Sequence, residues 1–203
     1  MSDIKGMVPT ESAVVHIYGE PNAGRTYFLL GISRELSEKG YTTIYYPAKI
    51  EFSNKNVNDI EEFYIINTTT IDEIFESMSV LMDKQTNPFV FIIDDLSLMR
   101  ASFEKDIDDL NLKRYILRFS ELCRLVIPKL KMNNCILLLT TQIRTQINQQ
   151  RTTTQLSFIN DLADIIHELR IVEKHPNSKI ISVKTINKIS DSISIDYLNI
   201  QLR

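Results

Sequence analysis

"GEPNAGRT" occupies residues 19–26 of the chain, namely Gly19, Glu20, Pro21, Asn22, Ala23, Gly24, Arg25 and Thr26. Two glycines separated by four residues, followed by a basic residue and a hydroxyl residue, have the spacing of a phosphate-binding loop. Backbone N–H groups in such a loop attract phosphate anions, and the glycines let the backbone wrap closely around them. We therefore predict a nucleotide site at residues 19–26, with Thr26 as a ligand of Mg²⁺.

Arg25 stands where a phosphate-binding loop ordinarily has lysine. The guanidinium keeps the positive charge, but it is planar and wide, whereas the lysine ammonium is a compact point charge. We expect nucleotide binding to survive this change and transition-state positioning to suffer. The alternative is an ordinary glycine turn between a strand and a helix in an unrelated α/β protein.

The segments around the loop alternate between strands and helices. Residues 13–18 form a short apolar run that predicts a buried strand, and residues 25–39 have a helical periodicity that stops at Gly40. The same patterns predict further strands at residues 42–50, 62–67, 88–95 and 135–141, and further helices at residues 71–84 and 111–132.

This alternation predicts an α/β fold with a mainly parallel central sheet, helices on both faces and antiparallel strands at the C-terminal end. The polar residues 1–12 are interpreted as a flexible lead-in, and residues 13–203 as a single domain. Thr70 and Glu73 are expected to form a capping box at the start of a helix. Pro128 is expected to kink or shorten the helix that contains it.

The apolar strand predicted at residues 88–95 ends in two aspartates. Asp94 closes the strand, where a carboxylate can orient the water shell of Mg²⁺. Asp95 comes next and is a candidate to polarise a water molecule. The ordinary alternative is a pair of strand-end aspartates that cap the following segment. Their position about 70 residues after the phosphate loop favours the nucleotide site.

A basic segment lies between residues 111 and 155, where eight basic residues stand against one acid, Glu121. The basic residues are Lys113, Arg114, Arg118, Arg124, Lys129, Lys131, Arg144 and Arg151. Within this segment, residues 142–157 are rich in Gln and Thr and predict a mobile loop. Arg144 and Arg151 are candidates to contact a nucleic-acid phosphate backbone. The loop has no aromatic residue to stack on bases, so a solvated helix face beside a polar loop stays an alternative.

The composition limits the classes of function. The 203 residues are 43% hydrophobic and 24% charged, which is ordinary globular usage, and the net charge of -3 gives no global sign of a nucleic-acid partner. Cys123 and Cys135 lie in apolar segments and are expected to be reduced core thiols. The N-terminus has no signal-peptide pattern, and no apolar run reaches the length of a membrane span. We therefore expect a cytoplasmic protein without a membrane partner.

Three motifs together resemble the RecA/RadA recombinase superfamily, in particular the short single-domain RadA paralogues of archaea. They are "GEPNAGRT", "FVFIIDDLSLMR" at residues 89–100 and "LLLTTQIR" at residues 137–144. The resemblance spans roughly residues 12–203 and implies a RecA-like P-loop core that binds ATP and Mg²⁺. It also implies that Asp94 is the magnesium aspartate and Gln142 the catalytic glutamine that senses the γ-phosphate. Residues 143–157 match the family's DNA-binding loop, with single-stranded DNA as the expected ligand.

The sequence departs from the family pattern at the catalytic glutamate. That residue follows the second strand in the family, where "YYPAKIEF" here has Lys49, with Glu51 two residues later. The chain also has no Phe-x-x-Ala polymerisation motif, and it begins about a dozen residues before its first strand, so filaments built in that way are not expected. Together with Arg25, these departures predict weak or absent ATP hydrolysis.

The leading hypothesis is a RadA/RecA paralogue that binds ATP, Mg²⁺ and DNA and modulates homologous recombination or DNA repair. Its protein partner would be the main recombinase or a junction-processing protein, and an oligomer is compatible with this role. A second hypothesis is a catalytically inactive RecA-fold pseudo-ATPase that acts as a protein–protein adaptor, which Arg25 and Lys49 favour. A small P-loop kinase is a third, and a motility or clock-signalling relative on the same core is a fourth.

Overall fold

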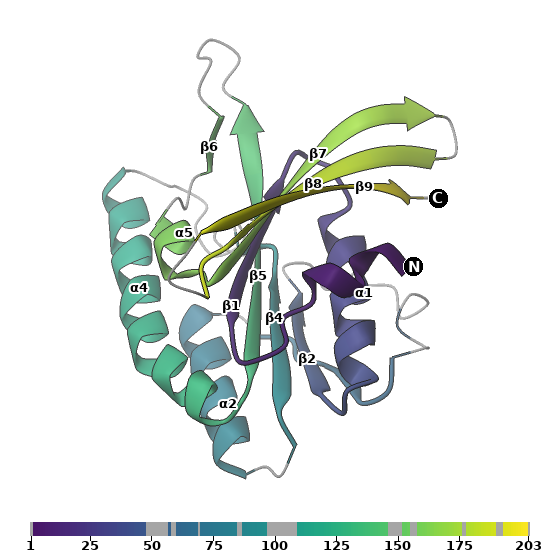
Figure 1. The fold of residues 1–203 in the computed structure, drawn as a ribbon. Coiled ribbons are helices and arrows are strands. Elements are labelled where there is room, and N and C mark those ends of the chain that lie inside the picture. Colours follow the sequence, from purple (N-terminus) through teal and green to yellow (C-terminus); the bar gives the residue numbers. More distant parts are fainter. Residues whose placement is uncertain are drawn as a thin grey trace.

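A nine-stranded sheet forms the centre of the computed structural model (Figure 1). Its strand order is β3-β2-β4-β5-β1-β7-β8-β9, with β6 paired to β5. The strands are β1 Val14–Gly19, β2 Thr42–Pro47, β3 Phe63–Ile65, β4 Phe89–Asp94, β5 Ile136–Thr145, β6 Thr152–Thr154, β7 Ile165–His175, β8 Ser178–Asn187 and β9 Ser194–Leu202. The structure describes residues 2–47, 57, 60–68, 70–84, 87–96, 109–145, 152–154, 158–175, 178–189 and 193–202.

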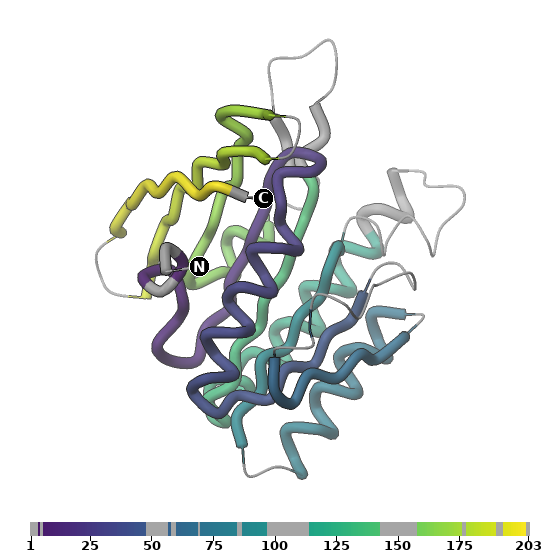
Figure 2. Tube along the Cα trace, turned by 90° about the vertical axis from the view of Figure 1, so that its right-hand side faces the viewer, coloured from purple at the N-terminus to yellow at the C-terminus, as the bar shows by residue number. Residues whose placement is uncertain are grey.

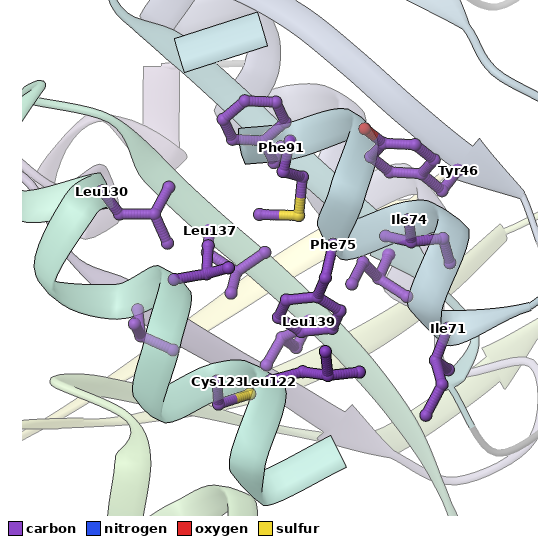
Figure 3. Packing of buried hydrophobic residues seen from close by; sticks show 14 of the residues in the cluster. Tyr46, Ile71, Ile74, Phe75, Phe91, Leu122, Cys123, Leu130, Leu137 and Leu139 are labelled. Atoms are coloured by element: carbon purple, nitrogen blue, oxygen red, sulfur yellow. The ribbon is translucent and has the colours of Figure 1, made fainter. Parts of the chain in front are cut away.

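Helices cover both faces of the sheet. They are the 3-10 helix η1 Ser2–Met7 and the α-helices α1 Arg25–Ser37, α2 Ile71–Lys84, α4 Asp109–Met132 and α5 Phe158–Leu162. Helices α2 and α4 pack Phe75 and Leu130 against Leu137 of β5 and the neighbouring apolar residues of β4 (Figure 3). On the other face, α1 and η1 form a second core in which Leu29 packs with Val15 of β1. No helix among the described residues is long and apolar enough to cross a membrane.

The central strands are parallel and the C-terminal strands are antiparallel, as the sequence predicts. Strands β3, β2, β4, β5, β1 and β7 run parallel to one another. Strands β7, β8 and β9 then form an antiparallel run. The β4 residues are all buried, because helices cover both faces of a parallel sheet. The carboxyl ends of β1, β4 and β5 therefore share one edge of the molecule.

The predicted start of α2 is confirmed in detail. The Glu73 backbone N–H donates to the Thr70 hydroxyl oxygen at 3.2 Å, and the Glu73 carboxylate accepts from the Thr70 backbone N–H at 3.2 Å. Each bond satisfies a backbone donor that the first turn of a helix leaves open. Of the two effects expected at Pro128, a kink or a shortening, the structure excludes the shortening, because α4 continues past Pro128 to Met132.

The segment expected to be a lead-in, residues 1–12, contains a short helix that packs on the rest of the chain. Helix η1 occupies residues 2–7, and Ile4 and Met7 are buried in the core that contains α1. A Cβ atom at Gly31 of α1 would lie 2.6 Å from the Ile4 side chain, so a glycine at this position leaves room for η1. Figures 1 and 2 both show η1 beside β9. Helix η1 was not predicted from the sequence, because the segment is mostly polar and has few apolar residues.

The polar segment at residues 142–157 also contains more regular structure than the sequence indicated. Strand β5 extends to Thr145, and β6 returns antiparallel to it, with Arg144 opposite Thr153 in the register. Backbone pairing between two Thr-rich strands explains this ladder, because β-branched residues favour strands. The interpretation of residues 142–157 as a mobile loop is therefore wrong for residues 142–145 and 152–154. Arg151 lies outside the described residues.

Gly19 ends β1 where β7 passes very close to it. A Cβ atom at this position would lie 2.6 Å from the Leu169 carbonyl oxygen and 3.0 Å from the Leu169 Cβ atom. Since the nearest atom is backbone, it cannot rotate away as a flexible side chain could. Gly19 thus serves the packing of β7 on β1 in addition to its predicted place in a phosphate-binding loop.

We expect Gly19→Ala to destabilise the protein by about 1–3 kcal/mol, because the new methyl group overpacks this contact. The free energy of unfolding in urea measures the effect. Gly6→Ala is the matched control, since a Cβ at Gly6 would meet nothing within 4 Å. Equal stability of the two variants would contradict the close approach of β7.

Candidate functional site

The segment between β1 and α1 is a tight turn followed by a left-handed glycine. The Ala23 backbone N–H donates to the Glu20 carbonyl oxygen at 3.1 Å, which closes a four-residue turn with Pro21 and Asn22 in the middle. Asn22 has a φ of 62°, and proline followed by a residue with positive φ is the signature of a type II turn. Gly24 then takes a φ of 89° as the N-cap of α1. The Pro21-Asn22 pair is a turn signal that is visible in the sequence, but the sequence prediction used only the spacing of the two glycines.

The start of α1 is suited to bind an anion. The first turn contains no acidic residue, and its first intrahelical bond runs from the Phe28 N–H to the Gly24 carbonyl at 2.9 Å. The backbone N–H groups that precede Phe28 therefore have no acceptor within the helix. These donors and the helix dipole favour negative charge at this end of α1.

Arg25 lies against the sheet, with three acceptors around its guanidinium. It donates to the Gly19 carbonyl at 3.0 Å and to the Thr141 carbonyl at 2.8 Å. It also forms a 2.9 Å ion pair with Asp95, and the two side chains are only 12% and 6% exposed. The planar fork of arginine suits such a set of contacts, which join the ends of β1, β4 and β5. A single ammonium could not reproduce the same arrangement.

Asp94 collects hydroxyl donors from three different elements. Its Oδ2 atom accepts from Thr26 of α1 at 2.9 Å and from Tyr45 of β2 at 2.6 Å. Its Oδ1 atom accepts from Thr140 of β5 at 2.6 Å. Burial, with the Asp94 carboxylate beside the hydroxyl, raises the pKa of Tyr45 well above its usual value. The Tyr45 hydroxyl therefore stays protonated, and able to donate, at neutral and moderately alkaline pH.

Gln142 completes the row of polar residues at this sheet edge. The register places Gln142 of β5 opposite Gly19 of β1, and Pro47 of β2 opposite Asp94. Ligands of open parallel sheets bind outside the carboxyl ends of the strands, which is where these residues lie. Lys49 and Glu51, which follow β2 in sequence, lie outside the described residues.

Most of the predicted nucleotide-site residues lie together. Gly19, Arg25, Thr26, Asp94 and Asp95 are linked by hydrogen bonds across the ends of two strands, β1 and β4, and the start of α1. The backbone of Arg144 lies further along β5, where β6 pairs with it.

The sequence prediction missed three residues that support the site: Tyr45, Thr140 and Thr141. Hydroxyl residues near the ends of apolar strands could have indicated them. A buried hydroxyl needs a hydrogen-bond partner, and the strand-end aspartates are candidates for that partner.

The donor set fits a magnesium ion that is shared with a nucleotide. Mg²⁺ prefers oxygen ligands and is usually held by one or two carboxylates together with phosphate oxygens and water. The Thr26 hydroxyl and the Asp94 carboxylate are in direct contact at the start of α1 and can supply such oxygens. When bound, the ion would offset the negative charge of the phosphates. Arg25 does not do this, because its own charge is paired with Asp95.

His16 supports the site from inside the sheet. It is fully buried in β1, with Nε2 2.8 Å from the Thr141 hydroxyl and Nδ1 2.5 Å from the Asn160 side-chain oxygen. Burial lowers the pKa of His16 to about 4. The imidazole is therefore neutral at pH 7, and its contacts connect β1, β5 and α5. His167 of β7 is likewise fully buried.

Comparison with solved structures identifies the fold. The ATPase domain of G40P has a TM-score of 0.60 and 14% identity, with coverage of 92% of this chain and 80% of that one. The RadB recombinase has a TM-score of 0.60 and 13% identity, with coverage of 84% and 80%. A DnaB-like replicative helicase, whose structure also describes its interactions with primase, has a TM-score of 0.59 and 14% identity. The match covers 92% of this chain and 55% of that one. No family model matches the sequence, and no curated protein matches it. The chain has a RecA-like ATPase fold.

We expect His16→Gln to flatten the acid side of the stability profile. A histidine whose pKa falls from 6.5 to about 4 on folding makes the unfolded state bind more protons between these values. Stability is therefore complete above pH 6.5 and falls as the pH drops toward 4, by up to about 1.4 kcal/mol per pH unit for one histidine. Urea unfolding at pH 7.5, 6.0 and 5.0 measures the slope.

His175→Gln serves as the control for this experiment, because the His175 side chain is 55% exposed. The His175 variant should keep the wild-type slope. A slope in the His16 variant as steep as that of the wild type would show that His16 is not the buried neutral group that the structure indicates.

Proposed function

We propose that the chain is a RecA-like nucleotide-binding protein that binds Mg-ATP at residues 19–26 and acts on DNA in recombination or repair. The observation that carries this proposal is the 2.9 Å contact between the Thr26 hydroxyl and Asp94. It joins the end of the phosphate-binding loop to the carboxylate that closes β4, the two parts from which a Mg-nucleotide site is assembled. Similarity in fold to a recombinase, to the ATPase domain of G40P and to a replicative helicase supports the same class of function.

We further propose that ATP hydrolysis is weak or absent. Asp95, the candidate to polarise water, accepts from the Arg25 guanidinium at 2.9 Å and is 6% exposed on its side chain. A carboxylate held in such a pair is a poor proton acceptor, because the pair stabilises its ionised form. Losing a positioned base removes roughly 10²–10⁴-fold of rate. The same pair supports the second candidate function, a pseudo-ATPase adaptor, in which the nucleotide site is a remnant.

The DNA-binding proposal rests on the extension of the sheet beyond the nucleotide site. Arg144 is on the β5 extension, two residues after Gln142, so the same strand connects the nucleotide edge to the paired β6. Arg144 and Arg151 supply charge for a phosphate backbone in a segment that contains no acid between residues 142 and 157. The protein partner proposed for this role is a recombinase or a junction-processing protein.

A Mg-ATP titration of Asp94→Asn tests the nucleotide site. We expect at least a tenfold loss of ATP affinity in the presence of Mg²⁺ and a smaller loss without it, because the amide keeps the shape but not the charge of a magnesium ligand. Asp196→Asn, at an exposed position on β9, is the matched control. If the wild type shows no ATP binding up to millimolar concentration, the adaptor function replaces the ATP-binding one.

The double substitution Arg144→Ala with Arg151→Ala tests the DNA proposal. We expect weaker binding of single-stranded DNA and a slope of log affinity against log salt that is smaller by about 1.4, since each lost phosphate contact contributes about 0.7. Arg114→Ala with Arg124→Ala removes the same charge from exposed positions on α4 and serves as the control. An unchanged affinity in the Arg144 and Arg151 variant would remove this segment from the proposed interface.

A further inference from the structure

The loop cation that ordinarily faces a phosphate is already engaged in this chain. The Arg25 guanidinium donates to two backbone carbonyls and is paired with Asp95, within 2.8–3.0 Å of all three acceptors. The charge of Asp95 cancels that of Arg25 at close range. A bound triphosphate would therefore meet backbone N–H groups at this loop but no uncompensated cation from the loop itself.

A lysine from the other end of the chain reaches the same loop. Strand β7 pairs Leu169 with Gly19 and continues to His175, so it runs past the end of β1 (Figure 1). Strand β8 returns beside it, with Lys179 opposite Lys174. The Lys179 ammonium donates a hydrogen bond to the Asn22 carbonyl oxygen, across 157 positions of sequence.

The chemistry of Lys179 suits a phosphate ligand better than that of Arg25 in its observed position. An ammonium has three donors, and the bond to Asn22 uses one of them. Lysine is a compact point charge on a flexible stem, which is the form of cation that phosphate-binding loops use. Lys179 is half-buried as a residue, and its hydrogen bond to the loop is exposed to solvent.

We propose that Lys179 supplies the positive charge that contacts the phosphates of the bound nucleotide, in place of Arg25. The site would then be built from two parts of the chain: the loop at residues 19–26 and the β7–β8 hairpin. The ligand class is a nucleoside di- or triphosphate. The inference rests on the proposed nucleotide binding, and it adds a residue that the loop motif does not contain.

Lys179→Gln and Lys179→Arg separate a cationic role from a structural one. Glutamine can still donate to the Asn22 carbonyl but carries no charge, whereas arginine keeps both the charge and the donors. We expect the glutamine variant to lose roughly tenfold or more in ATP affinity, as for a lost charge-assisted hydrogen bond. The arginine variant should retain most of the affinity. Lys174→Gln removes the neighbouring charge on β7 and should bind ATP as the wild type does.

Two further readouts make the outcome decisive. Inorganic tripolyphosphate is used as a competitor of ATP, and it has phosphates but no base or sugar. Its affinity should fall in the Lys179→Gln variant by the same factor as that of ATP. The urea midpoint of that variant should equal that of the wild type, since the Lys179 contact is exposed. Equal ATP affinity of wild type and Lys179→Gln would overturn the proposal, and so would a loss that Lys179→Arg shares. A wild type that binds no ATP would instead overturn the nucleotide-binding function itself.

Discussion

The arrangement of the site depends on how the buried carboxylate of Asp94 is satisfied. A carboxylate taken out of water needs hydrogen-bond donors on its oxygens, because leaving it unpaired is strongly unfavourable. Hydroxyl groups from α1, β2 and β5 meet this need within 2.6–2.9 Å. Each bond fixes one element relative to β4. The start of α1, and with it the loop at residues 19–26, is thereby held over the carboxyl ends of the parallel strands.

Arg25 and Asp95 form a second set of contacts at the same edge. Their ion pair and the two carbonyl bonds of Arg25 connect the ends of β1, β4 and β5 without any ligand. The residue that sits at the phosphate-contacting position of the motif is thus a structural residue in this chain. A pair that joins strand ends is compatible with a site that binds nucleotide and turns it over slowly. It also explains why a conservative change from arginine to lysine would not be neutral for the fold.

The two ends of the chain meet on the side of the sheet that carries β7, β8 and β9. Helix η1 packs on α1 in the core that also contains Ile200 of β9, and β7 approaches β1 so closely that only glycine fits at position 19. These contacts place the β7–β8 hairpin beside the phosphate-binding loop. The loop is therefore supported by α1 on one side and approached by the hairpin on the other.

The sequence by itself determined the local features of this protein. Apolar runs and helical periodicity predicted the parallel strands and the three long helices. The Thr70–Glu73 pattern predicted a cap that the structure contains, and the loop spacing located Gly19 and Thr26. Only the tertiary structure decided what Arg25 contacts, which hydroxyls bind Asp94, and that η1 is part of the core. These are contacts between residues far apart in the chain, and they depend on strand order and register. Propensity and spacing act over a few residues, so they carry no information about which distant side chain will arrive at a given site.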